Sequence, residues 1–207
     1  LSLGLGLSGC FRTATFTSAQ PLEAGRHELA VRGNALGILS GTDGGAVAVG
    51  ALRYRVGLDG TQDLGLSLGT DGAYLQYKRA LVGGTTRLSL APEVGGFFLG
   101  DDYTQFSAQV PLLVGWAVGG SHELTLAPRL GVVVGGDFDG RGDDFGVMPV
   151  AALSFGGTFR LGRTVRLVPE VALNYPVVAL RDDVSWNHDF LVVEAGLALA
   201  FEFGGSD

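Results

Sequence analysis

The stretch RLSLAPEVGGFF, residues 87–98, decides the fold because its side chains alternate in character with a period of two. Alternate positions on one face are Leu88, Leu90, Pro92, Val94, Gly96 and Phe98. The positions between them are Arg87, Ser89, Ala91, Glu93, Gly95 and Phe97. A period of two is the pattern of a β-strand with one apolar face, whereas a helix repeats every 3.6 residues. The stretch therefore predicts a strand.

The same alternation recurs along most of the chain. Near the end, Leu197, Leu199, Phe201 and Phe203 alternate with Gly196, Ala198, Ala200 and Glu202. The other segments that show it are 26–37, 46–58, 62–69, 73–81, 104–118, 123–135, 147–160 and 165–178. The 35 glycines argue against long helices, because each costs about 1 kcal/mol in a helix relative to alanine. We expect an all-β domain of about ten strands, with eight as the alternative count.

Short and long connections alternate between these segments. The short ones are Asp59-Gly60-Thr61, Gly83-Gly84-Thr85, Gly119-Gly120-Ser121 and Leu161-Gly162-Arg163. The other set is 38–45, 99–103, 136–146 and 180–188, with Thr70-Asp71-Gly72 as its one short member. This second set, with the residues at its edges, holds eleven of the fourteen aspartates. A meander with two such different rims is typical of a membrane barrel.

The composition of the polar face indicates which face points inward. In a soluble lipocalin-like barrel this face would be exposed to water and would carry many Lys, Thr, Glu and Gln residues. Here the face is mostly Gly, Ala and Ser, which fit the concave inside of a narrow cylinder, with scattered charges that could pair across a lumen. The predicted lumen charges are Arg32, Arg53, Arg55, Lys78, Arg87, Glu93, Arg129, Arg160, Arg166, Glu170, Glu194 and Glu202, together with Glu28 and Glu123. We therefore predict an antiparallel up-and-down transmembrane β-barrel whose lumen is plugged by Arg/Glu pairs.

On these features, residues 25–203 resemble the small bacterial outer-membrane β-barrels. The aromatic residues that fall near strand ends, as interfacial girdles do, are Trp116, Tyr54, Tyr77, Tyr175, Phe98 and Phe190. The last strand, ending at Phe203, resembles the C-terminal signal read by barrel-assembly machinery, although a tail of residues 204–207 follows it. The resemblance implies a monomer in the bacterial outer membrane, with membrane lipid and that machinery as partners.

The first ten residues, LSLGLGLSGC, end in the only cysteine of the chain. An aliphatic residue and two small residues before Cys10 resemble the lipobox of a bacterial lipoprotein signal peptide. The resemblance implies cleavage before Cys10 and lipid on its thiol, so that 1–9 would be a signal-peptide remnant and 10–24 a lipidated periplasmic tether. The alternative is a chance cysteine in an apolar stretch.

The sequence points to a structural or surface-interaction role through acidic outer loops, without catalysis and without a cofactor. The net charge of −7 argues against a nucleic-acid partner. A narrow polar channel for small solutes or ions is the second hypothesis, and an outer-rim lipid hydrolase that uses His188 with Ser185 is the third. Carboxylates at Asp137, Asp139, Asp143 and Asp144 have a spacing that could gather calcium, although no glutamate closes the loop as in an EF-hand.

Overall fold

The computed structural model describes residues 14–40, 43–99, 103–137, 145–177 and 190–205 of the 207-residue chain. The strands are β1 (Arg26–Ser40), β2 (Asp43–Gly57), β3 (Gln62–Gly69), β4 (Gly72–Val82), β5 (Thr86–Leu90), β6 (Glu93–Leu99), β7 (Tyr103–Val118), β8 (His122–Asp137), β9 (Phe145–Arg160), β10 (Val165–Pro176) and β11 (Phe190–Gly204). Each strand pairs antiparallel with its neighbours, and β1 pairs with β11, so the sheet closes on itself. The predicted all-β barrel is confirmed.

Strands β5 and β6 are two parts of one barrel strand. Both pair with β4 on one side and with β7 on the other, and the register is the same before and after Ala91 and Pro92. Pro92 has no N–H, but the neighbouring Ala91 still donates to the carbonyl of Pro111 at 3.0 Å. The described part of the chain therefore forms a closed barrel of ten strands, as the sequence predicts.

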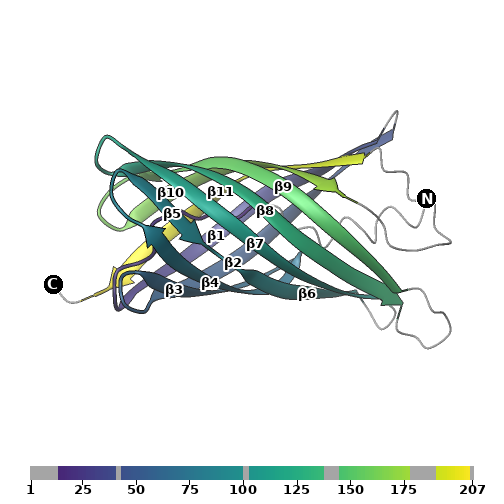
Figure 1. Ribbon diagram of the computed structural model, residues 1–207, viewed down its shortest axis with the longest axis horizontal. Helices are drawn as coiled ribbons and strands as arrows, with labels where there is room; N and C mark the ends of the chain where they lie inside the picture. The colour runs from purple at the N-terminus through teal and green to yellow at the C-terminus, as the bar shows by residue number, and fades with distance from the viewer. Residues whose placement is uncertain (1–13, 41–42, 100–102, 138–144, 178–189, 206–207) are drawn as a thin grey trace.

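The two ends of the cylinder differ in the connections that they carry (Figure 1). At one end, which we call the short-turn end, lie the turns 58–61, 83–85, 119–121 and 161–164. The opposite, long-loop end carries 70–71 and the connections 41–42, 100–102, 138–144 and 177–189. Gly60, Gly84, Gly119 and Gly120 adopt positive φ angles in the short turns, where a side chain would be strained. Asp59 accepts hydrogen bonds from the hydroxyl and the backbone N–H of Thr61, and these fix one of the short turns. The same hydrogen bonds hold the pKa of Asp59 below its usual value.

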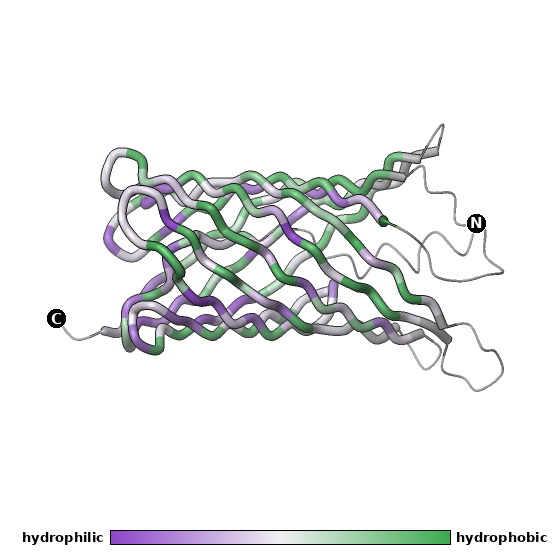
Figure 2. The backbone as a smooth tube through the Cα atoms, viewed as in Figure 1, coloured by the Kyte–Doolittle hydropathy of each residue, from purple (hydrophilic) through white to green (hydrophobic). Residues whose placement is uncertain are grey.

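The outward face of the barrel is apolar and the inward face is polar. Leu130, near the middle of β8, is 70% exposed, and its neighbour Arg129 is only 5% exposed. Figure 2 shows this alternation as hydrophobic and hydrophilic residues that succeed one another along each strand. In the described residues, no helix is long and apolar enough to cross a membrane. An apolar surface around a charged interior is the inverse of a soluble barrel, so the outward face is the one that meets lipid.

Residues 14–22 lie inside the barrel, which corrects the prediction of a periplasmic tether over 10–24 for the part that the structure describes. Ala14, Phe16 and Ala19 are completely buried, and Leu22 is 2% exposed. The chain reaches β1 at Arg26, at the short-turn end, so the segment runs through the lumen before the first strand begins. We call residues 14–22 the lumen segment. A tether in water would leave these apolar side chains exposed, and the lumen buries them instead.

Candidate functional site inside the barrel

Carboxylates of the barrel wall hold the backbone of the lumen segment. Glu194 accepts a hydrogen bond from Ala14 N–H at 2.9 Å, and Glu123 accepts one from Ala19 N–H at 2.5 Å. The N–H groups of Thr15 and Phe16 donate to the two oxygens of Glu170 at 2.7 and 2.5 Å. Leu22 N–H donates to Asp63 at 3.2 Å. A buried N–H needs an acceptor, and here acidic side chains take the place that a neighbouring strand would have.

Phe16 is the apolar anchor of the lumen segment. Its ring packs in a buried cluster with Ala14, Val168, Ala172 and Ala198. The small residues on the inward faces of β10 and β11 leave the space that the ring fills, which explains their abundance on this face. Phe16 has a φ of +46°, the left-handed region that a residue with a side chain rarely adopts.

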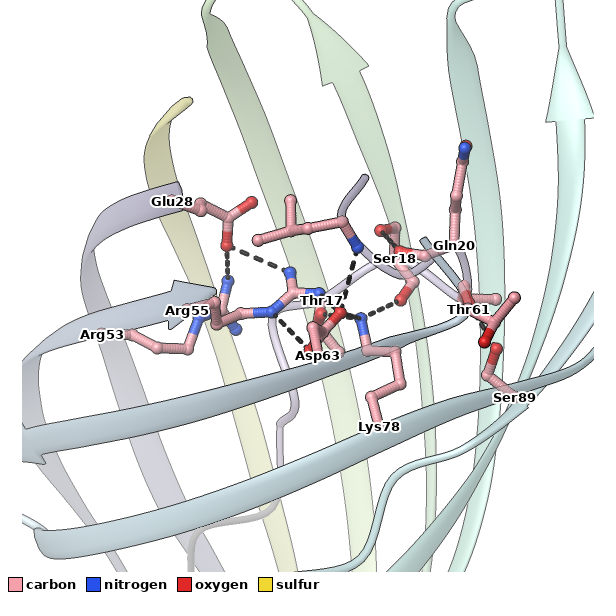
Figure 3. A network of polar contacts seen from close by, with 12 residues as sticks. Thr17, Ser18, Gln20, Glu28, Arg53, Arg55, Thr61, Asp63, Lys78 and Ser89 are labelled. Carbon is pink, nitrogen blue, oxygen red and sulfur yellow. Dashed lines mark hydrogen bonds and ion pairs between the residues drawn. The ribbon is translucent and has the colours of Figure 1, made fainter. Parts of the chain in front are cut away.

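A network of charges surrounds the lumen segment near the short-turn end (Figure 3). Arg55 donates to Asp63 through Nε at 3.2 Å and through Nη2, a bidentate contact, and its Nη1 lies 3.1 Å from Glu28. Arg53 also reaches Glu28 at 3.1 Å, and its Nη1 donates to the carbonyl of Thr15 at 2.8 Å. These side chains are all at least 95% buried, so each charge depends on its partners.

Lys78 is the second cation that contacts the lumen segment. Its Nζ donates to Thr17 Oγ1 at 2.9 Å and to the carbonyl of Ser18 at 2.8 Å, and it lies 3.6 Å from Asp63 (Figure 3). The ammonium group is completely buried. Cations of the wall thus bind the carbonyls of the segment, and carboxylates bind its N–H groups.

Further ion pairs line the rest of the lumen. Arg87 pairs with Glu123 at 2.7 Å, and Arg129 lies 3.8 Å from Glu170. Two other pairs are Arg32 with Asp71 and Arg166 with Glu202. Opposite charges therefore meet at several levels of the cylinder, from Asp71 at the long-loop end to Glu202 near the short-turn end.

The predicted lumen residues are inward-facing, and several of them form Arg/Glu pairs, while others have different partners. Glu93 accepts from the amides of Gln76 at 3.4 Å and Gln109 at 2.7 Å, and Arg87, on the same barrel strand, pairs with Glu123. Arg160 is exposed at the short-turn end. The remaining predicted residues, buried or largely buried, are Arg32, Arg53, Arg55, Lys78, Arg129, Arg166, Glu170, Glu194 and Glu202.

Two aspartates of the network were not among the predicted lumen residues. Asp63 follows a short turn and alternates with Gly65 and Ser67, while Leu64 and Leu66 face outward, so the period of two could have placed it inside. Asp71 belongs to a connection at the long-loop end, yet its side chain turns into the lumen toward Arg32. No pattern in the sequence distinguishes Asp71 from the aspartates around it.

Several predicted sites lie outside the described residues. These are Cys10, Ser185, His188, Asp139, Asp143 and Asp144, together with the side chain of Asp137 at the end of β8. Among the residues that are described, no three His, Cys, Asp or Glu side chains are arranged to hold a metal ion. His27 is the second residue of β1 and His122 the first of β8, so both lie at the short-turn end.

The closed antiparallel barrel, its apolar outer surface and its charged interior define the class of the protein, a transmembrane β-barrel. No protein-family model and no curated protein matches the sequence. Solved barrels that resemble it include Neisserial surface protein A, with 12% identity over 86% of this chain and 99% of that one and a TM-score of 0.48. Ail of Yersinia pestis has 12% identity over 87% and 99%, with a TM-score of 0.38. The Escherichia coli protease OmpT has 9% identity over 91% and 100%, with a TM-score of 0.44.

Proposed function

We propose that this protein is a non-conducting outer-membrane barrel with a structural or surface-interaction role, plugged by its lumen segment together with the charge network. The observation that carries the proposal is the set of hydrogen bonds from five successive or nearby N–H groups of the segment to wall carboxylates. If only side-chain packing held the segment in the lumen, these buried N–H groups would lack acceptors, at a cost of about 1–3 kcal/mol each.

The position of the segment supports a closed lumen. A ten-stranded barrel encloses little more space than an eight-stranded one, and side chains alone fill the interior of an eight-stranded barrel. In this barrel the space is shared by the wall charges, the ring of Phe16 and the backbone of residues 14–22. A hydrated ion would have to displace buried groups that are already paired. The narrow channel is therefore the second candidate function, and it requires the segment to leave.

The acidic long-loop end supports a surface role. The sequence places eleven of its fourteen aspartates in or beside the connections of that end. In outer-membrane barrels the longer connections face the cell exterior, and the short turns face the periplasm. A concentration of carboxylates there favours a cationic partner through long-range attraction that salt weakens. Catalysis is not part of the proposal, because the hydrolase hypothesis rests on Ser185 and His188 alone.

A planar-bilayer measurement tests the plug. We expect the refolded full chain to give no stable conductance, and a variant that lacks residues 1–22 to give discrete ion-conducting steps. Glu170→Ala is the milder variant, because it removes the acceptor of Thr15 and Phe16 and leaves the chain length unchanged. Robust conductance from the unmodified protein would promote the channel hypothesis instead.

Lipidation of Cys10 is a separate proposal, supported by the lipobox-like residues before it. Metabolic labelling with a fatty-acid analogue tests it, with Cys10→Ala as the control that should lose the label. An unlabelled native protein would exclude the lipid and leave the barrel unchanged. Three residues separate Cys10 from the buried Ala14, and the two Cα atoms lie at most about 14 Å apart along the chain, so a lipid could not be joined through a long free tether.

A further inference from the structure

A polar cavity of about 220 Å³ lies at the short-turn end, where the lumen segment leaves the barrel. Ser18 and Gln20 of the chain line one side, and the ends of β8, β9 and β10 contribute His122, Thr158 and Arg166. The volume exceeds the space of several water molecules. A smaller cavity of about 80 Å³ adjoins it, and Gln20, Arg160 and Arg166 line both.

The hairpin between β9 and β10 brings three arginines to this cavity. Arg160 and Arg166 are direct partners across the two strands, and Arg163 lies in the turn between them and lines the adjoining cavity. Like charges at directly opposed strand positions destabilise a sheet. Arg166 is paired with Glu202, but Arg160 and Arg163 form no ion pair with any described residue. The hairpin thus carries more positive charge than the described carboxylates neutralise.

Two polar atoms at the cavity are buried and lack partners. The hydroxyl of Thr158, a residue that is 6% exposed, and Nε of Arg166 form no hydrogen bond within the described part of the chain. The Nε2–H group of His122 is a third donor. His122 Nδ1 accepts the backbone N–H of Arg160 at 3.2 Å, so the neutral ring carries its proton on Nε2. Buried polar groups are normally satisfied, so these atoms indicate a ligand that accepts hydrogen bonds.

The charge of the lining indicates which ligand. Arg87, Arg160 and Arg166 line the cavity with a single carboxylate, Glu123, which is already paired with Arg87. Arginine forks match the oxygens of phosphate, and hydroxyl and imidazole donors complete such sites. We infer that the short-turn end binds a phosphate group, held by Arg160, Arg166 and Thr158. The site adjoins the plug, because Ser18 and Gln20 of the lumen segment line the cavity, and it does not depend on the surface role proposed above.

Two sources could supply the phosphate, a free or small-molecule phosphate and the headgroup of a membrane lipid. Titration calorimetry of the detergent-solubilised full chain with inorganic phosphate at low ionic strength tests the first. Binding of the same protein to nanodiscs or vesicles with and without phosphatidic acid, followed by phosphorus NMR, tests the second. Saturable binding in either arm supports the site and names its source, and no binding in both arms overturns it.

Two variants identify the residues. Thr158→Val removes the unpartnered hydroxyl without a change of shape, and Arg160→Gln removes a charge that has no carboxylate partner in the described residues. Each should weaken phosphate binding roughly ten-fold, the loss of one charge-assisted hydrogen bond. Thr158→Val should leave the unliganded barrel at least as stable as before, which separates lost binding from lost folding. Arg79→Gln, an exposed charge on the outward face near the same end, is the matched control and should bind normally. Equal weakening by Arg79→Gln would show that only general charge attraction acts, and would contradict the site.

Discussion

Glu170 and Thr15 lie 155 positions apart in the chain, and the carboxylate accepts hydrogen bonds from both the backbone N–H and the hydroxyl of Thr15. The carboxylate accepts the backbone N–H of Thr15 at 2.7 Å, and its two oxygens each lie 3.2 Å from the Thr15 hydroxyl. One wall residue on β10 therefore fixes both the main chain and the side chain of the lumen segment. Because Arg129 lies 3.8 Å from the same carboxylate, the contact also links the segment to the charges of the wall.

Glu170→Ala should destabilise the barrel by about 3–5 kcal/mol, because it removes the acceptor of two buried N–H groups and a negative charge that lies close to the buried Arg129. Urea unfolding of the refolded protein in detergent, followed by the mobility of the folded form on gels, measures the change. Leu173→Ala, which truncates an outward-facing side chain on the same strand, is the control. A loss for Glu170→Ala no larger than for Leu173→Ala would mean that the lumen segment does not occupy this position.

Phe16 allows the backbone and the side chain of the segment to be tested separately. Phe16→Ala should cost about 3–5 kcal/mol of stability, because the ring fills a buried cluster. At ordinary extended positions glycine is less stable than alanine by about 0.5–1 kcal/mol. Here the φ of +46° removes that disadvantage, so Phe16→Gly should be at least as stable as Phe16→Ala in the same unfolding measurement. The opposite order would contradict the left-handed conformation of this residue.

The lipid-facing surface predicts a dependence on depth. Leu130→Arg, near the middle of β8, should cost about 2–4 kcal/mol when the barrel is folded into lipid vesicles, and Val118→Arg, at the short-turn end of β7, about 0–1 kcal/mol. Both side chains are exposed on the outward face, so their difference isolates the position in the membrane. Similar small costs at both positions, with a barrel that stays monomeric without detergent, would refute a membrane location.

The strands and their faces could be predicted from the sequence because they depend on local alternation. The expected segment 104–118 became Tyr103–Val118, and 147–160 became Phe145–Arg160. Pro92 interrupts the pairing of its strand without a shift of register at that position. A missing N–H removes one hydrogen bond of the ladder, and it does not by itself insert a residue.

The lumen segment could not be predicted in the same way. Residues 14–22 alternate only over Ala14–Thr17, which is too short to predict a strand. The carboxylates that bind this segment come from four separate strands and are Asp63, Glu123, Glu170 and Glu194. Which carboxylate takes which N–H depends on the stagger of the strands around the closed barrel, and a single sequence does not contain that stagger. The same reason explains why the sequence does not identify Glu123 as the partner of Arg87.

The bidentate contact between Arg55 and Asp63 permits the sharpest test of the charge network. Each of Arg55→Gln and Asp63→Asn should cost about 3–5 kcal/mol, because each leaves a buried charge with a lost partner. In the double variant both charges of the pair are absent. Its loss of unfolding free energy should therefore be smaller than the sum of the two single-variant losses by about 0.5–3 kcal/mol. Urea unfolding of the four proteins in one detergent gives this coupling energy directly. A second cycle with Asp63→Asn and Arg129→Gln, which share none of the contacts described above, should be additive within about 0.5 kcal/mol. If the first cycle is as additive as the second, the pair does not act as a unit inside the barrel.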